Sequence, residues 1–171
     1  NIGKWIQALG KRGWITPEWP KEYGGGGLDR KHAAAMKGEF KAVRAPMVSS
    51  FGTSMLGPTL LQFGTDEQKL EFLPAISKHE VKWCQGYSEP GAGSDLASLQ
   101  TRAVLEGDEY VVTGQKIWTT GADKADCIFC LVRTDPEASK HDGISFILFP
   151  MHQDGVEVSP LNLIDGTAEF S

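Results

Sequence analysis

The chain changes character at Val81-Lys-Trp-Cys-Gln-Gly-Tyr-Ser-Glu-Pro-Gly-Ala-Gly-Ser-Asp95. Its first five residues, 81–85, predict a strand, and the small residues after Glu89 predict an irregular turn. Before this stretch the apolar residues recur at helical spacing, and after it they form short β-branched runs. Because helices come first and strands later, without βαβ alternation, the sequence predicts an α+β fold rather than a parallel-sheet nucleotide fold. We expect a helical domain over 1–80 and a β-domain over 81–171.

The upstream half predicts a set of short helices joined by loops. We expect one helix before Gly13, one from the cap Asp29 to about Arg44, one after Pro46 that is kinked or interrupted at Gly57-Pro58, and one from Thr65 to Pro74. The last has the clearest start, because Thr65 and Gln68 have the spacing of a capping box. The Pro- and Gly-rich segment 14–27 predicts a loop that its aromatic residues hold against the body.

The downstream half predicts strands. Further short apolar or β-branched runs occur at 101–105, 110–113, 116–119, 127–132 and 144–149. Glu106-Gly-Asp-Glu109 has the composition of a hairpin turn. Cys127 and Cys130 form a C-x-x-C within one of these runs, and an odd separation places them on opposite faces of a strand. We therefore expect core packing there rather than a redox pair or a metal site.

Composition narrows the class of function. The net charge is −5 over 171 residues, and no basic stripe of the kind that nucleic-acid binding needs is present. No uninterrupted apolar run predicts a membrane span, and the first residues lack the apolar core of a signal peptide. Three cysteines, an odd and small number, favour free thiols in a reducing compartment.

Familiar catalytic devices are missing from the sequence. It contains no G-x-G-x-x-G between strand and helix, no phosphate-binding P-loop and no G-x-S-x-G elbow. The four histidines, His32, His79, His141 and His152, have no metal-ligand spacing. Any chemistry must therefore be sought in less common patterns.

Two segments stand out. In 85–95 the small residues allow close approach to the backbone, whose N–H groups can form an anion-binding concavity with the Ser94 hydroxyl. A wide polar turn capped by Asp95 explains the same residues slightly better. In 114–122, Trp118 lies beside two threonines and could face a planar heterocycle, although a buried Trp between strand-forming threonines is the simpler interpretation.

Taken together, the two segments resemble the acyl-CoA dehydrogenase family. Residues 87–95 correspond to the family's [T/S]-E-P-x-A-G-S-D motif, and Gly114-Gln-Lys-Ile-Trp-Thr-Thr120 to its G-x-K-x-[W/Y]-[I/T/S]-[T/S] strand. Supporting matches lie in 63–74, in the 13–25 loop and in Gly143-Ile-Ser-Phe146. The resemblance implies an N-terminal helical domain followed by an antiparallel, β-barrel-like middle domain, with the family's C-terminal helical domain absent from these 171 residues.

The resemblance also implies a cofactor, FAD, and assigns residues to it. Gln85, Tyr87 and Ser88 would approach the isoalloxazine ring, while Gly93 and Ser94 would lie by the phosphates, with Ser94 also near the acyl-CoA substrate. Trp118 would be a neighbour of the flavin, and Thr119 and Thr120 would supply donors to its reactive edge. No catalytic residue is assigned, because the family's glutamate base belongs to the C-terminal domain.

The implied reaction is α,β-dehydrogenation of an acyl-CoA thioester, with electrons passed to an electron-transfer flavoprotein. The family implies a homodimer or homotetramer, or a heteromer, in the cytoplasm or in the mitochondrial matrix of a eukaryote. The Trp83–Gly86 lead-in resembles members that act on bulky acyl groups, including steroid side chains. Ser88 and Thr119 depart mildly from the commoner Thr and Ile or Ser.

Three alternatives stay open at this point. An acyl-CoA oxidase or nitroalkane oxidase would share the scaffold, and a non-catalytic subunit of a heteromer would share the motifs but lack the base. If both motifs were coincidental, a generic β-rich binding domain without flavin affinity would remain.

Overall fold

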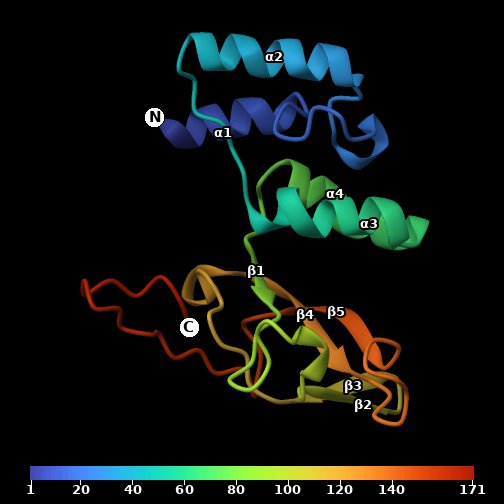
Figure 1. The fold of residues 1–171 in the computed structure, drawn as a ribbon. Helices are drawn as coiled ribbons and strands as arrows, with labels where there is room; N and C mark the ends of the chain where they lie inside the picture. The colour runs from blue at the N-terminus through green and yellow to red at the C-terminus, as the bar shows by residue number, and fades with distance from the viewer. The chain divides into compact units, whose positions relative to one another are not determined.

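The computed structural model describes residues 1–171, which divide into two units, Asn1–Lys82 and Trp83–Ser171 (Figure 1). The first unit is helical and the second is built on a β-sheet, so the α+β order expected from the sequence is confirmed. The helices are α1 (Ile2–Lys11), α2 (Arg30–Ala42), α3 (Gly57–Phe63) and α4 (Asp66–Ser77). None of them is both long and apolar enough to cross a membrane.

Local capping explains where the helices begin. The Asp29 carboxylate accepts the backbone N–H of His32 at 2.9 Å, which starts α2 at the expected cap. Thr65 and Gln68 form the predicted capping box, in which each side chain accepts the other residue's backbone N–H, at 3.3 and 3.0 Å. Each cap satisfies amide groups that the first helical turn leaves without partners.

Aromatic residues hold the helical unit together. Trp5 and Trp14 both pack against Phe40, with ring centroids 5.6 and 6.1 Å apart, in a cluster that includes buried Leu9. A Cβ on Gly57 would lie 1.9 Å from the ring of Trp19. The loop 14–27 is thus held against the helices by its tryptophans, as the sequence predicts.

One expected helix end was wrong, and the expected kink or interruption at Gly57-Pro58 takes the form of a change of helix type. A π-helix at Gly52–Leu56 runs directly into α3, and the Gly57 N–H donates to the Gly52 carbonyl five residues earlier. This wide turn places Pro58 in the first turn of α3, where no N–H is needed, so the helical path continues. The helix α4 continues through Pro74 to Ser77, where Leu73, Ile76 and Ser77 are fully buried. The free energy gained by this burial outweighs the cost of the one backbone hydrogen bond that Pro74 removes.

The second unit has one mixed sheet. Its strands are β1 (Trp83–Gly86), β2 (Arg102–Glu106), β3 (Glu109–Thr113), β4 (Cys127–Arg133) and β5 (Ile144–Pro150). The order is β1-β4-β2-β3, and β5 also pairs with β4. The pairs β2–β3 and β4–β5 are antiparallel as expected, whereas β1 and β2 both run parallel to β4. The long connection from β1 to β4 permits this parallel pairing, which a tight hairpin could not.

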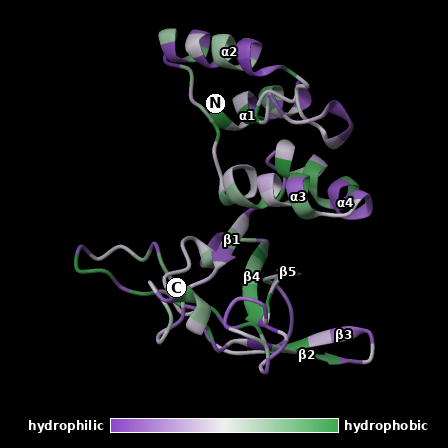
Figure 2. Cartoon of the chain, turned by 45° about the vertical axis from the view of Figure 1, so that its right-hand side comes forward, coloured by the Kyte–Doolittle hydropathy of each residue, from purple (hydrophilic) through white to green (hydrophobic).

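The core of this unit gathers around β4, which Figure 2 shows as a hydrophobic strand. Cys84, Ile128, Cys130 and Val132 are buried there. Burial raises the pKa of the Cys84 thiol to about 12 and that of Cys130 to about 11, although a backbone hydrogen bond opposes the shift at Cys84 and the Lys116 charge opposes it at Cys130. Cys130 of the C-x-x-C therefore serves the core, as predicted, while Cys127 is partly buried.

Candidate cofactor-binding site

The first motif begins on β1 and leaves the sheet through a tight turn. Gln85 lies on the strand, and Glu89 and Ala92 then exchange two backbone hydrogen bonds, of 2.8 and 3.0 Å. The turn raises Pro90 and Gly91 to the surface. The irregular segment expected after Glu89 is therefore a defined turn.

The residues that follow the turn leave open space and free donors. A Cβ added to Gly91 or Gly93 would meet no atom within 4 Å. The backbone N–H groups of Gly93 and Ser94 donate to no backbone carbonyl, and the exposed Ser94 hydroxyl is without a hydrogen-bond partner in the chain. Unpaired donors beside glycine suit an anionic group such as a phosphate. The donor set therefore fits the phosphates of the implied cofactor.

Glu89 turns inward from the same motif and is buried. Its carboxylate accepts the backbone N–H groups of Gln100 at 2.6 Å and Thr101 at 2.9 Å, and it contacts the Lys116 ammonium at 2.8 Å. Burial alone raises the pKa of Glu89, but the hydrogen bonds from Lys116, Thr101 and Gln100 outweigh it and hold the pKa at about 2, below the ordinary 4.5. Glu89 is therefore charged at neutral pH.

Lys116 links the second motif to the first. Its ammonium donates to the Tyr87 carbonyl at 3.2 Å as well as to Glu89, and the Ile117 N–H donates to the Ser88 carbonyl at 2.9 Å. The two motifs, which are 27 residues apart at Glu89 and Lys116, are thus side by side in the structure. The sequence predicts each motif but not these contacts.

The second motif was expected to be a strand over 116–119, and this was wrong. Trp118 has a φ of 61°, which a bulky residue rarely adopts and which breaks the pleat. Thr119 exchanges backbone hydrogen bonds of 2.9 and 3.2 Å with Ser171. The segment therefore pairs with the last residues of the chain and leaves the sheet.

The exposed Trp118 ring has one aromatic neighbour in the structure. Phe170 meets it edge to face, with centroids 5.9 Å apart, and 57% of Trp118 stays exposed. The sequence-based alternative of a buried Trp was wrong. An exposed indole beside unpaired hydroxyls is a surface that a planar heterocycle can cover.

The remaining predicted site residues differ in how accessible they are. The Tyr87 ring packs edge-on against Phe129 at 5.8 Å, and burial raises the pKa of its phenol, with a hydrogen bond from Gln85 opposing the shift. Thr119 is buried, whereas Thr120 is exposed and neither its hydroxyl nor its N–H has a partner in the chain. Thr120 is thus the more available donor of the two threonines.

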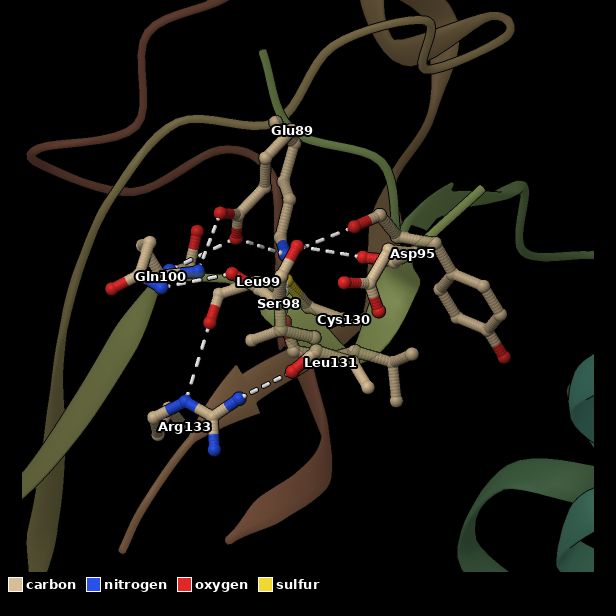
Figure 3. Close-up of polar contacts among 12 residues, drawn as sticks. Glu89, Asp95, Ser98, Leu99, Gln100, Cys130, Leu131 and Arg133 are labelled. Atoms are coloured by element: carbon tan, nitrogen blue, oxygen red, sulfur yellow. Dashed lines mark hydrogen bonds and ion pairs between the residues drawn. The ribbon is translucent and has the colours of Figure 1, made fainter. Parts of the chain in front are cut away.

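Arg133 supports the segment that follows the first motif, and sequence analysis missed it. Its guanidinium donates to the carbonyls of Leu99 at 3.2 Å and Ala97 at 2.8 Å, as the dashed lines around Arg133 in Figure 3 show. Figure 3 also shows Glu89 beside Gln100, at the other end of the same segment. Two features of the sequence could have pointed to these supporting contacts. One is an Arg at the end of an apolar strand, and the other is a Glu and a Lys inside the two motifs.

Comparison with known proteins is consistent with this geometry. The sequence models of the acyl-CoA dehydrogenase N-terminal and middle domains match residues 3–80 and 84–169. Acyl-CoA dehydrogenase IpdE1 of Mycobacterium tuberculosis is 47% identical over 168 residues, which are 98% of this chain and 44% of that protein. The chain thus spans less than half the length of this curated relative.

Solved structures agree in fold. The Tcur3481-Tcur3483 steroid ACAD superposes with a TM-score of 0.82 at 43% identity, over 98% of this chain and 43% of that one. The ChsE4-ChsE5 complex of Mycobacterium tuberculosis superposes with a TM-score of 0.80 at 40% identity, over 98% and 43%. With both domain models matched in order along the sequence, the chain belongs to the acyl-CoA dehydrogenase family, whose members are flavoproteins.

Proposed function

We propose that the complete protein catalyses FAD-dependent α,β-dehydrogenation of an acyl-CoA thioester and passes the electrons to an electron-transfer flavoprotein. The observation that carries the proposal is the direct contact between the two motifs at Glu89 and Lys116. This contact brings together the two segments that the family uses for the same cofactor. FAD, when bound, supplies the acceptor for the β-hydrogen as hydride.

The residues of this chain hold the cofactor in the proposal. Gly93 and Ser94 donate to its phosphates, because their N–H groups are unpaired and open to solvent. Ser94 also reaches the acyl-CoA ligand. Unpaired donors of this kind are already oriented before the ligand arrives, which lowers the cost of ordering them on binding.

The ring-facing residues are Gln85, Tyr87 and Ser88 from the first motif and Trp118, Thr119 and Thr120 from the second. Trp118 offers an exposed aromatic face. Of the two threonines, Thr120 supplies the side-chain donor, since Thr119 is buried and its N–H is taken by Ser171. A donor aimed at the ring edge stabilises negative charge that develops on reduction.

The substrate class that we propose is a bulky acyl-CoA such as a steroid-derived thioester. Support comes from the likeness to a structure described as a steroid ACAD. The Trp83–Gly86 segment, which packs into the core through Trp83 and Cys84, resembles that of family members acting on bulky acyl groups. The compartment that we propose is the cytoplasm, or the matrix of a mitochondrion, because the three cysteines are free thiols, as is usual in a reducing compartment.

A second candidate is a subunit of a heteromer, with the complete site shared between two kinds of chain. The specific observation is that two of the similar structures are named as pairs, Tcur3481-Tcur3483 and ChsE4-ChsE5. In that case the chain still binds flavin or faces it, and its activity depends on the partner.

The first experiment is an absorbance spectrum of the purified full-length protein, followed by anaerobic addition of straight-chain and steroid-derived acyl-CoA thioesters. Bleaching of a flavin spectrum by one thioester supports the proposal and identifies the substrate class. A flavin spectrum that no thioester bleaches, alone or with a co-expressed partner, argues against dehydrogenation. Protein that is colourless and takes up no FAD would refute the cofactor assignment.

A further inference from the structure

The Glu89–Lys116 pair is buried in a way that stability alone does not explain. Only 6% of the Glu89 side chain and 10% of the Lys116 side chain are exposed. Desolvation makes buried ion pairs costly, so that apolar residues of similar size are often as stable. Both carboxylate oxygens and the ammonium, however, have hydrogen bonds beyond the pair itself, with Gln100, Thr101 and Tyr87 as the partners. Such a network fixes one relative geometry of the groups that it joins.

The segments that the pair joins carry the ring-facing residues. Glu89 follows Tyr87 and Ser88 directly, and Lys116 precedes Trp118 by two residues. Three bonds connect the segments: Lys116 to Glu89, Lys116 to the Tyr87 carbonyl, and the Ile117 N–H to the Ser88 carbonyl. A shift of Lys116 would therefore move Trp118 relative to Ser88.

The backbone of Trp118 needs this support. A φ of 61° is unfavourable for a residue with a bulky side chain, and it persists only where the surroundings determine it. The hydrogen bond from the Ile117 N–H to the Ser88 carbonyl fixes the chain on one side, and the Thr119–Ser171 pairing fixes it on the other. The ring itself is exposed, so its own packing does not account for the conformation.

We propose that Glu89 and Lys116 are positioning residues that set the distance and orientation of Trp118 and Thr120 relative to Tyr87 and Ser88, and through them the environment of the flavin. This inference rests on the proposed function. Neither residue touches the reacting atoms. Loss of either charge leaves the other buried without its partner and lets the two segments move apart.

The test uses full-length holoenzyme with Lys116→Met, which keeps most of the length of the side chain and removes its charge. Flavin content, the visible circular dichroism of the flavin, its midpoint potential by chemical reduction and its rate of reduction by thioester in a single turnover are measured. We expect retained flavin, altered circular dichroism and a shifted potential, and a reduction rate lowered about tenfold or more with little change in the thioester concentration that gives half of the maximal rate. Lys124→Met, which removes an exposed ion pair with Asp123 in the same unit, is the matched control and should resemble wild type.

Glu89→Gln provides a second variant should Lys116→Met fail to fold, because the single carbonyl oxygen of glutamine can still accept one of the two backbone N–H groups of Gln100 and Thr101. The double variant should be no slower than the worse single variant, since the two residues act as one unit. Variants that melt earlier yet keep wild-type circular dichroism, potential and reduction rate would overturn the inference and leave a purely structural pair. A wild-type flavin that no thioester reduces would instead count against the proposed function, and the spectral comparison would still decide the positioning role.

Discussion

At the scale of single residues, Glu89 shows how charge organises this chain. A buried carboxylate stays charged only when its hydrogen bonds and ion pairs contribute more free energy than desolvation costs. For Glu89, one ammonium and two backbone amides supply these interactions. Its pKa of about 2 means that folding favours the charged form. The stabilisation is therefore complete above the unfolded pKa near 4.5 and is lost as the pH falls toward 2.

Glu89→Gln tests this pH dependence. At neutral pH we expect the variant to lose about 3 kcal/mol of unfolding free energy, because the Lys116 charge stays buried without its counter-ion. The difference from wild type should shrink as the pH falls from 4.5 toward 2, since wild-type Glu89 then becomes protonated as well. Urea unfolding at a series of pH values measures it, with Glu71→Gln at an exposed position of α4 as the control. A difference that is constant with pH would contradict the assignment.

A substitution at Gly93 distinguishes an effect on folding from an effect on cofactor binding. Its Cβ position is open, and its φ lies outside the left-handed region, so Gly93→Val should leave the melting temperature unchanged. The added methyl groups would occupy the space that we propose for the phosphates of the cofactor, and we expect flavin affinity to fall at least about tenfold. Titration of apoprotein with FAD measures this. Gly38→Val, also in open space but on α2, should bind flavin like wild type, and equal affinity in the two variants would remove Gly93 from the site.

At the scale of elements, the π-helix at Gly52–Leu56 and the start of α3 depend on one close approach. Gly57 lies against the indole of Trp19, which comes from the loop 14–27. A helical position without a side chain costs up to about 1 kcal/mol relative to Ala. Here the absence of a side chain allows the loop to pack.

Gly57→Ala should therefore destabilise the helical unit despite its better helix propensity. A Cβ at 1.9 Å from Trp19 forces the ring or the loop to move, and overpacking of this kind costs about 1–3 kcal/mol or more. Gly38→Ala, with an open Cβ position within α2, should instead stabilise slightly. Thermal unfolding followed at the helical circular dichroism band compares them, and equal melting temperatures would show that Trp19 does not pack as described.

At the scale of the whole molecule, each unit has its own core, and the sheet ends in an exposed hairpin. The edge strand β3 pairs only with β2, and the hairpin presents Val104, Leu105, Tyr110, Val111 and Val112 to solvent. Figure 2 shows apolar stretches along both strands. An apolar edge with unpaired backbone groups is a site of association.

A protein limited to residues 1–171 should therefore self-associate through this hairpin. Val104 and Val111 lie directly opposite each other, so Val104→Lys with Val111→Glu adds a cross-strand ion pair and a charged edge. We expect this double variant to be more monomeric than the parent in light scattering after size exclusion. Val43→Lys, at an exposed apolar position of the helical unit, should change nothing, and association unaffected by the double change would place the contact elsewhere.

Much of the fold follows from local sequence. The capping box at Thr65, the cap at Asp29 and the hairpin turn of Glu106 and Glu109 all form as predicted, because each depends on residues a few positions apart. The errors lie where distant contacts compete with local preference. Pro74 remains inside a helix because its neighbours are buried, and the segment 116–119 leaves the sheet because Ser88 and Ser171 take its backbone groups.

By itself, the sequence determined the order of helices and strands, the family and the two motifs, since these reside in short patterns of residue type. Only the tertiary structure decided the parallel pairing of β1 and β2 with β4, the exposure of Trp118 and the buried contact of Glu89 with Lys116. The physical reason is the distance along the chain between the residues that interact. Strand direction and a buried ion pair join residues that are far apart along the chain, and their free energy depends on burial that the folded chain alone creates.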